Sequence, residues 1–165
     1  MSIILGIDPG TTTVGYGVIE VTGNTRKILD CGVIKTTPKI ELSQKILDIN
    51  TDLLELIQAY KPSLCGIEKL FFHTNVTTAI DVAQSRGAML LCLGQKGIQI
   101  REFTPLQVKK GICGNGRAPK TQVQNALRLI FGLTDIPKPD DAADALAIAY
   151  IASLGNLGNL GRYNS

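Results

Sequence analysis

The first 34 residues contain three short apolar runs that are separated by turn residues. Runs of this length, bounded by Gly, Thr and Asn, are typical of β-strands. They predict strands at residues 3–8, 15–20 and 27–34, with TGN at 22–24 as the turn between the last two. Because consecutive strands joined by short connections usually pair, we expect these three to form an antiparallel meander.

Beyond residue 40, helical spacing alternates with two further strand signals. Apolar residues recur every three or four positions over 43–60, which predicts a helix with Ser43 as its N-cap. The stretch GICGNGRAP at 111–119 is expected to form a glycine-rich loop. The other predicted helices lie at 74–96, 104–111, 120–131 and 141–154, and the other predicted strands at 62–68 and 98–103.

This order of elements predicts an α/β fold with a mixed five-stranded sheet, antiparallel in its first three strands and flanked by helices on both faces. The strands at 3–8 and 62–68 are expected to form a central parallel pair. The length of 165 residues suits one domain, which we assign to residues 1–154. The segment GNLGNLGRYNS at 155–165 lacks a core-forming pattern, so we expect a flexible tail there.

The composition indicates a globular, cytoplasmic protein. Hydrophobic residues make up 44% of the chain, and the longest apolar segment, AIAYIASL, is too short to span a bilayer. The N-terminal sequence MSIILGID lacks the basic region and cleavage site of a signal peptide. The cysteines lie far apart without a CxxC pair, which favours reduced thiols that belong mostly to the core. These are Cys31, Cys65, Cys92 and Cys113.

Positive charge is concentrated in one part of the chain. The formal net charge is only +3, but residues 86–130 carry eight basic side chains and one acidic side chain, Glu102. Such a segment forms either an ordinary solvated face or the binding surface for a polyanion such as a nucleic acid. The basic residues are Arg86, Lys96, Arg101, Lys109, Lys110, Arg117, Lys120 and Arg128.

Two predicted strands each end in a carboxylate. Asp8 follows IILGI, and Glu68 follows LCGI. Each acid by itself could simply form a turn, but in an open α/β sheet ligands gather beyond the carboxyl ends of neighbouring strands. If the two strands pair, Asp8 and Glu68 face one crevice.

A second pair of acids opens the last predicted helix, in the sequence PDDAADALAIAY. Asp141 and Asp144 are three residues apart and share one helical face, and Asp140 is the expected N-cap. Acids in a first helical turn also favour the helix dipole, which is the simpler explanation. However, the Ala-rich remainder of the helix indicates close packing on the sheet, where acids facing inward require cations.

Four carboxylates in one crevice would be suited to divalent metal ions. Oxygen ligands favour Mg²⁺ or Mn²⁺ over zinc, and the chain has a single histidine, His73, and no cysteine cluster. Two such ions can activate a water molecule and stabilise the leaving oxygen during phosphodiester hydrolysis.

Five motifs in this order resemble the RuvC-type Holliday-junction resolvases of the RNase H-like superfamily. They are GIDPGTTTVGYGVI, GIEKLFF, SRGAML, TPLQVKKGICGNGRAPKTQVQ and DDAADALAIA, and the resemblance runs from residue 1 to about 155. It implies an RNase H-like sheet and a homodimer that binds four-way DNA junctions and makes paired symmetric nicks. It also implies two Mg²⁺ ions per active site, replaceable by Mn²⁺, and coupling to the RuvA and RuvB branch-migration complex.

The resemblance assigns roles to individual residues. The implied metal ligands are Asp8, Glu68, Asp141 and Asp144, with Asp140 as the neighbouring alternative to Asp141. Lys109 and Lys120 match lysines near the scissile phosphate, and Lys110 and Arg117 are further candidates for DNA contact. Phe71 matches an aromatic residue that stacks on a junction base, whereas His73 is expected to be an ordinary loop residue.

Three other functions fit parts of the same sequence. The motif GIDPGTT also occurs in actin-like phosphotransferases, but these need a second phosphate-binding hairpin and a longer chain. A YqgF-type nuclease acting on RNA or on other branched DNA would share the acids. A junction-binding protein without activity would be expected to lack one or more of them.

Overall fold

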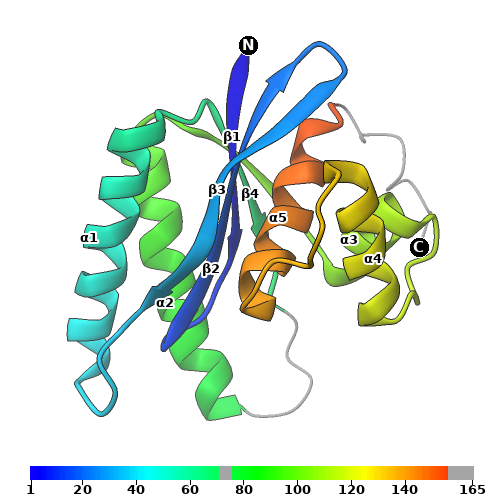
Figure 1. The fold of residues 1–165 in the computed structure, drawn as a ribbon. Coiled ribbons are helices and arrows are strands. Elements are labelled where there is room, and N and C mark those ends of the chain that lie inside the picture. Colours follow the sequence, from blue (N-terminus) through cyan, green and yellow to red (C-terminus); the bar gives the residue numbers. More distant parts are fainter. Residues whose placement is uncertain (71–75, 156–165) are drawn as a thin grey trace, which may run out of the picture.

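The computed structural model describes residues 1–70 and 76–155, and its centre is a five-stranded sheet (Figure 1). The strand order is β3-β2-β1-β4-β5. The first three strands pair antiparallel, and β4 pairs parallel with both β1 and β5. The predicted meander and the central parallel pair are therefore confirmed. The strands are β1 (Ser2–Asp8), β2 (Thr13–Thr22), β3 (Thr25–Lys35), β4 (Leu64–Glu68) and β5 (Gln99–Phe103).

Helices cover both faces of the sheet, as predicted. Two lie together on one face and the other three lie on the opposite face (Figure 1). The first group is α1 (Leu42–Tyr60) and α2 (Val76–Gln95). The second group is α3 (Pro105–Cys113), α4 (Lys120–Phe131) and α5 (Asp140–Ser153).

The alternation of side chains along β1 gives each face its own core. Ile4 packs with α5, whereas Leu5 and Ile7 pack with α1 and α2. Successive strand side chains point to opposite faces, so a strand covered on both sides reads as a continuous apolar run. This explains why IILGI and LCGI have no polar positions before their terminal acids.

Helix α5 lies unusually close to the sheet because glycines of three strands face it. A Cβ built on Gly6 would lie 2.1 Å from the backbone oxygen of Ala145, and one on Gly66 would lie 2.9 Å from the Cβ of Ala152. Gly6 is the register partner of both Gly17 and Gly66, so the glycines form a row across the sheet. The Ala-rich helix therefore packs on bare backbone, which fixes its height above β1.

The structure corrects several local predictions. Helix α1 begins at Leu42, so Ser43 lies inside its first turn and makes no capping bond. Pro139 occupies the N-cap position of α5, which leaves Asp140 as the first helical residue. Helix α3 continues to Cys113, and so includes the first three residues of the predicted glycine-rich loop. Thr104, in contrast, opens α3 with a reciprocal capping box to Gln107.

All four cysteines are free thiols. Cys65 and Cys92 are buried, whereas Cys31 and Cys113 are partly exposed, so the prediction of core positions holds fully for two of them. None of the described helices combines the length and apolar character that crossing a membrane requires.

Candidate active site

Asp8 and Glu68 lie side by side at the ends of β1 and β4. Ile7 and Ile67 are parallel register partners, and each acid is the next residue of its strand. Both acids have the same strand parity as Gly6 and Gly66, whose faces lie against α5. Because strand side chains alternate, the two carboxylates therefore point to the α5 side of the sheet.

The N-terminal turn of α5 brings the third predicted acid to the same place. Gly15 is the antiparallel register partner of Asp8. A Cβ built on Gly15 would lie 2.1 Å from the backbone oxygen of Asp141 and 3.1 Å from its Cβ. Asp141 is therefore adjacent to the strand end that carries Asp8. The N-terminal end of the helix dipole also favours acidic side chains there.

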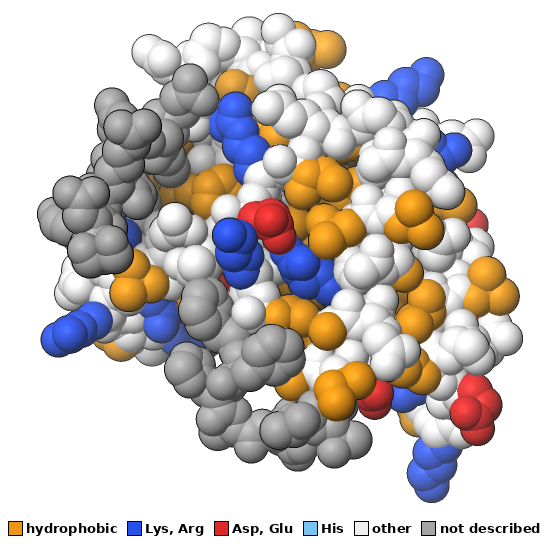
Figure 2. Space-filling model, turned by 180° about the vertical axis from the view of Figure 1, so that it is seen from behind, with side chains coloured by type: hydrophobic (Ala, Val, Ile, Leu, Met, Phe, Trp, Pro, Cys, Tyr) orange, Lys and Arg blue, Asp and Glu red, His pale blue; other side chains and the backbone are white. Residues whose placement is uncertain are grey.

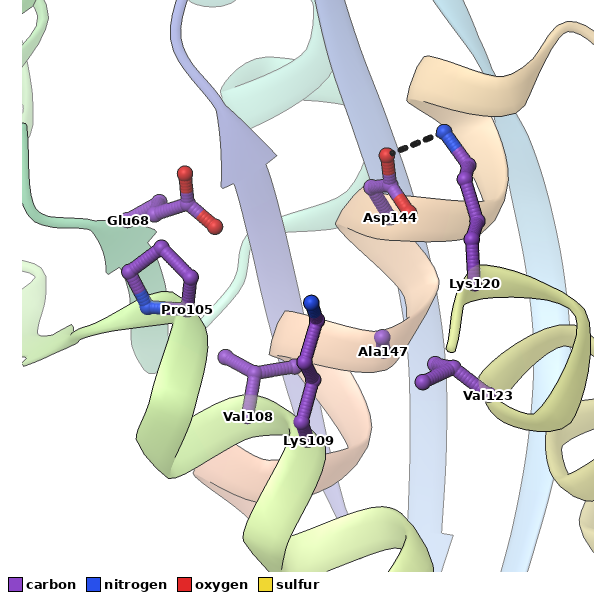
Figure 3. Close-up of a pocket in the computed structure, with 8 residues that line it drawn as sticks. All are labelled: Glu68, Pro105, Val108, Lys109, Lys120, Val123, Asp144 and Ala147. Atoms are coloured by element: carbon purple, nitrogen blue, oxygen red, sulfur yellow. Dashed lines mark hydrogen bonds and ion pairs between the residues drawn. The ribbon is translucent and has the colours of Figure 1, made fainter. Parts of the chain in front are cut away.

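A cavity of about 220 Å³ connects the fourth acid with two predicted lysines (Figure 3). Glu68 and Asp144 lie on opposite sides of it, Lys109 points between them, and Lys120 turns toward Asp144. The rest of the lining is apolar and comes from α3, α4 and α5: Pro105, Val108, Val123 and Ala147. The cavity thus presents carboxylates and ammonium groups together against a fixed apolar wall.

The carboxylates interact strongly enough to change their protonation. The pKa of Asp8 is raised to about 7, mainly by burial and then by the charges of Glu68, Asp144 and Asp141, against an opposing effect of Lys120. Burial also raises the pKa of Glu68, with a contribution from Asp144 and an opposing one from Lys109. The structure therefore brings all four predicted acids into one electrostatic cluster.

Lys120 is paired with acids of α5, a contact that no pattern in the sequence indicates. Its Nζ lies 3.1 Å from Asp144 and 3.2 Å from Asp140. Partial burial lowers the pKa of Lys120, but the hydrogen bonds and charges of the two acids outweigh this and raise it. Asp140 also accepts a hydrogen bond from Gln124 and is the more exposed acid. Its position outside the cluster favours Asp141 as the third acid beside Asp8.

The donor set fits a hard divalent cation. All four acids offer oxygen ligands, and their mutual repulsion, visible in the raised pKa of Asp8, would be relieved by positive charge. Within residues 1–70 and 76–155, however, no three His, Cys, Asp or Glu side chains lie close enough to hold a metal ion as they stand. The Lys120 ion pair with Asp144 supplies one cation to the cluster in this arrangement.

The remaining predicted DNA contacts are distributed around this cavity. Lys109 lines it, and Lys110 follows on the same helix. Arg117 is exposed in the connection between α3 and α4, where its backbone N–H donates to the side chain of Asn115. Phe71 and His73 lie outside the described residues.

Two arginines of the basic segment bind backbone oxygens of the protein itself. Arg86 forms an ion pair with Glu102 and donates from Nε to the backbone oxygen of Glu68 at 2.8 Å. Arg101 donates to the backbone oxygens of Ala152 and Gly155 at the end of α5. The segment therefore offers fewer cations to a polyanion than its composition indicates. Sequence composition cannot distinguish an arginine that binds backbone oxygens from one that faces solvent.

Comparison with known proteins gives this geometry its context. Residues 4–152 match the family of crossover junction endodeoxyribonuclease RuvC. The chain belongs to the RuvC family. The RuvC crossover junction endodeoxyribonuclease of Petrotoga mobilis is 49% identical over 148 residues, which cover 90% of this chain and 91% of that protein. The RuvC of Halothermothrix orenii is 48% identical over 147 residues, which cover 89% of each chain.

Solved structures agree with this assignment. Thermus thermophilus RuvC in complex with a Holliday junction substrate has a TM-score of 0.86 at 34% sequence identity, with 92% of each chain covered. The resemblance inferred from the five motifs and the mixed sheet expected for it are therefore confirmed. A RuvC-family chain is an endodeoxyribonuclease, so the phosphotransferase interpretation of GIDPGTT is not favoured.

Proposed function

We propose that this RuvC-family chain resolves four-way DNA junctions by paired symmetric nicks. One observation carries the proposal: Glu68 of β4 and Asp144 of α5 line one cavity with Lys109 and Lys120, and the charges of both acids act on Asp8 at the end of β1. The relative solved with a Holliday junction has the same fold over nearly its whole length. The proposed ligands of two Mg²⁺ ions, or of Mn²⁺ in their place, are Asp8, Glu68, Asp141 and Asp144.

The acids and the lysines of the site have different proposed roles around the phosphodiester. Divalent ions held by the four acids would supply an activated water molecule and stabilise the departing oxygen. Asp8 is partly buried, and the charges of the other three acids raise its pKa. Its carboxylate therefore lies within electrostatic reach of all three. Lys109 and Lys120 enter the same cavity from α3 and α4, where their ammonium groups can contact the phosphate.

Further cations and one aromatic residue extend the proposed DNA surface. Lys110 and Arg117 lie beside the cavity-lining elements and are proposed to contact the DNA backbone, which supplies affinity without sequence preference. Phe71 follows Glu68 by three positions and is proposed to stack on a junction base. Because it lies outside the described residues, this role stays a prediction.

The proposal includes a homodimer formed through the α1 and α2 side of the sheet. Leu47, Ile80 and Leu91 are between 49% and 62% exposed there, and a shallow apolar groove runs between the two helices. Figure 2 shows exposed hydrophobic side chains on this side of the molecule. Two active sites related by a twofold axis would match the symmetry of a junction. Coupling to the RuvA and RuvB complex is proposed from family membership alone.

The test compares a labelled four-way junction with a linear duplex of the same sequence. We expect paired nicks at symmetric positions of the junction with Mg²⁺ and none with EDTA. Cleavage of the linear duplex or of RNA at the same rate would instead support the YqgF-type alternative. Tight junction binding without cleavage would leave a binding protein and contradict the proposed role of the acids.

A further inference from the structure

Two consecutive residues of α2 hold the backbone on both sides of the acid cluster. Ser85 is 1% exposed, and its hydroxyl donates a hydrogen bond of 2.8 Å to the backbone oxygen of Gly10. Gly10 lies two residues after Asp8. The next side chain, Arg86, donates from Nε to the backbone oxygen of Glu68 itself. The chain segments that carry Asp8 and Glu68 are thus bound to the same turn of one helix.

The guanidinium of Arg86 is fixed from its other end. Its Nη2 forms an ion pair with the carboxylate of Glu102 in β5, and the Arg86 side chain is only 13% exposed. The planar guanidinium allows both bonds at once, which a lysine amine on a flexible stem cannot reproduce. Arg86 therefore joins α2, the end of β4 and β5 in a single network.

Arg86 acts on Glu68 through the backbone and not through its charge. The cation that opposes the raised pKa of Glu68 is Lys109, which lies on the other side of the sheet from α2. The positive charge of Arg86 is instead compensated by Glu102. Its bond to the Glu68 oxygen fixes where the strand ends, and hence where the carboxylate starts.

Such a constraint matters because the strand ends carry like charges. Asp8 and Glu68 each follow the last residues that pair β1 with β4, Ile7 and Ile67, at the carboxyl ends of these strands. Ionised carboxylates repel one another, and without a restraint the segments after β1 and β4 would move apart. Holding ligands at fixed separation before the cation arrives reduces the free energy that binding must spend on ordering them.

We propose that Ser85 and Arg86 are positioning residues that hold the backbone at Asp8 and Glu68 in the arrangement needed for divalent cation binding. This inference rests on the proposed role of Asp8 and Glu68 as metal ligands. It assigns to SRGAML a purpose that the sequence motif by itself did not reveal.

The decisive variant is Arg86→Gln, with Arg101→Gln as a matched control. Arg101 also binds backbone oxygens in the same protein, but at the far end of α5. The first readout is Mn²⁺ affinity of the DNA-free protein, measured by titration of Mn²⁺ alone. We expect Arg86→Gln to weaken Mn²⁺ binding and slow single-turnover cleavage, each by about 10–100-fold. Junction affinity in EDTA should stay within about twofold of the unmodified protein, because no DNA contact is lost.

Two more variants keep the test sharp if Arg86→Gln unfolds. Arg86→Lys retains a positive charge near Glu102 but cannot form both bonds, so an intermediate loss of Mn²⁺ affinity is expected. Ser85→Ala removes only the bond to Gly10 and should give a smaller loss. Mn²⁺ affinity equal to that of Arg101→Gln for all three variants would overturn the inference.

Glu68→Gln separates this inference from the proposed function. If Glu68→Gln binds Mn²⁺ and cleaves normally, the assignment of the acids as ligands fails. If Glu68→Gln loses both properties while the Arg86 and Ser85 variants lose neither, the acids are ligands and only the positioning role is wrong.

Discussion

Gly15 leaves no room for a side chain between β2 and the backbone of Asp141. A Cβ at this glycine would lie 2.1 Å from the Asp141 carbonyl oxygen, well inside van der Waals contact. Since Gly15 is also the register partner of Asp8, this contact sets how closely α5 approaches the end of β1. The missing side chain at position 15 therefore determines the separation of two acids that are far apart in the sequence.

Gly15→Ala is expected to damage both stability and cleavage. The added methyl group must push α5 away from β2, which we expect to destabilise the protein by about 1–3 kcal/mol. The shift also separates Asp141 from Asp8 and should lower the cleavage rate. Thermal unfolding and single-turnover cleavage measure the two effects. Gly94→Ala in α2 is the control, because a Cβ there meets nothing within 4 Å and should leave stability unchanged or improved. Equal stability of both variants would contradict the close contact.

Asp8→Asn is expected to stabilise the metal-free protein at high pH while abolishing cleavage. The pKa of Asp8 is raised from 3.8 to about 7, so between these values the folded protein holds a proton that the unfolded chain has lost. The retained proton therefore stabilises the folded protein at low pH, and this stabilisation is lost as pH rises from about 4 to about 7. In EDTA, Asp8→Asn should raise Tm by about 3–8 °C at pH 8. At pH 4 the two proteins should differ little, and a lower Tm of the variant at pH 8 would contradict the burial of an unfavourable charge.

Divalent ions are expected to stabilise the protein through Glu68. Adding Mg²⁺ or Mn²⁺ should raise Tm at pH 8, because a ligand that binds only the folded state stabilises it. Protonation of Asp8 competes with the cation, so the increase should be smaller at pH 5. Glu68→Gln should show little increase, bind the junction almost normally and fail to cut it. An undiminished metal-dependent increase in this variant would exclude Glu68 as a ligand.

Lys120→Ala is expected to weaken junction binding more than folding. Lys120 and its partners Asp140 and Asp144 are 37–63% exposed, and ion pairs at such sites contribute less than about 1 kcal/mol to stability. Loss of one phosphate contact should instead reduce the slope of log affinity against log salt by about one. Binding titrations over a range of salt concentrations measure this slope. Lys45→Ala on α1, on the opposite face of the sheet, is the control, and equal slopes for both variants would argue against phosphate contact by Lys120.

Local signals predicted helix ends less well than strands. Ser43 and Asp140 have the right chemistry for N-caps, but α1 begins one residue earlier and Pro139 takes the cap position of α5. Asp140 instead uses its carboxylate for Lys120 and Gln124. A side chain with two possible partners is decided by which one the fold brings within reach, and this information is not local.

Local patterns in the sequence were enough to predict the antiparallel pairing of the first three strands, the alternation of strands and helices, and the acids that end the two central strands. These features follow from hydrophobic period and from chain connectivity, which act over a few residues. Tertiary packing alone brings Lys120 to Asp144, 24 positions away, and Ser85 to Gly10, 75 positions away. It also decided that the glycines of β1, β2 and β4 face α5. Such contacts depend on distances of a few ångströms between segments that meet only when both cores are packed, and no local pattern encodes those distances.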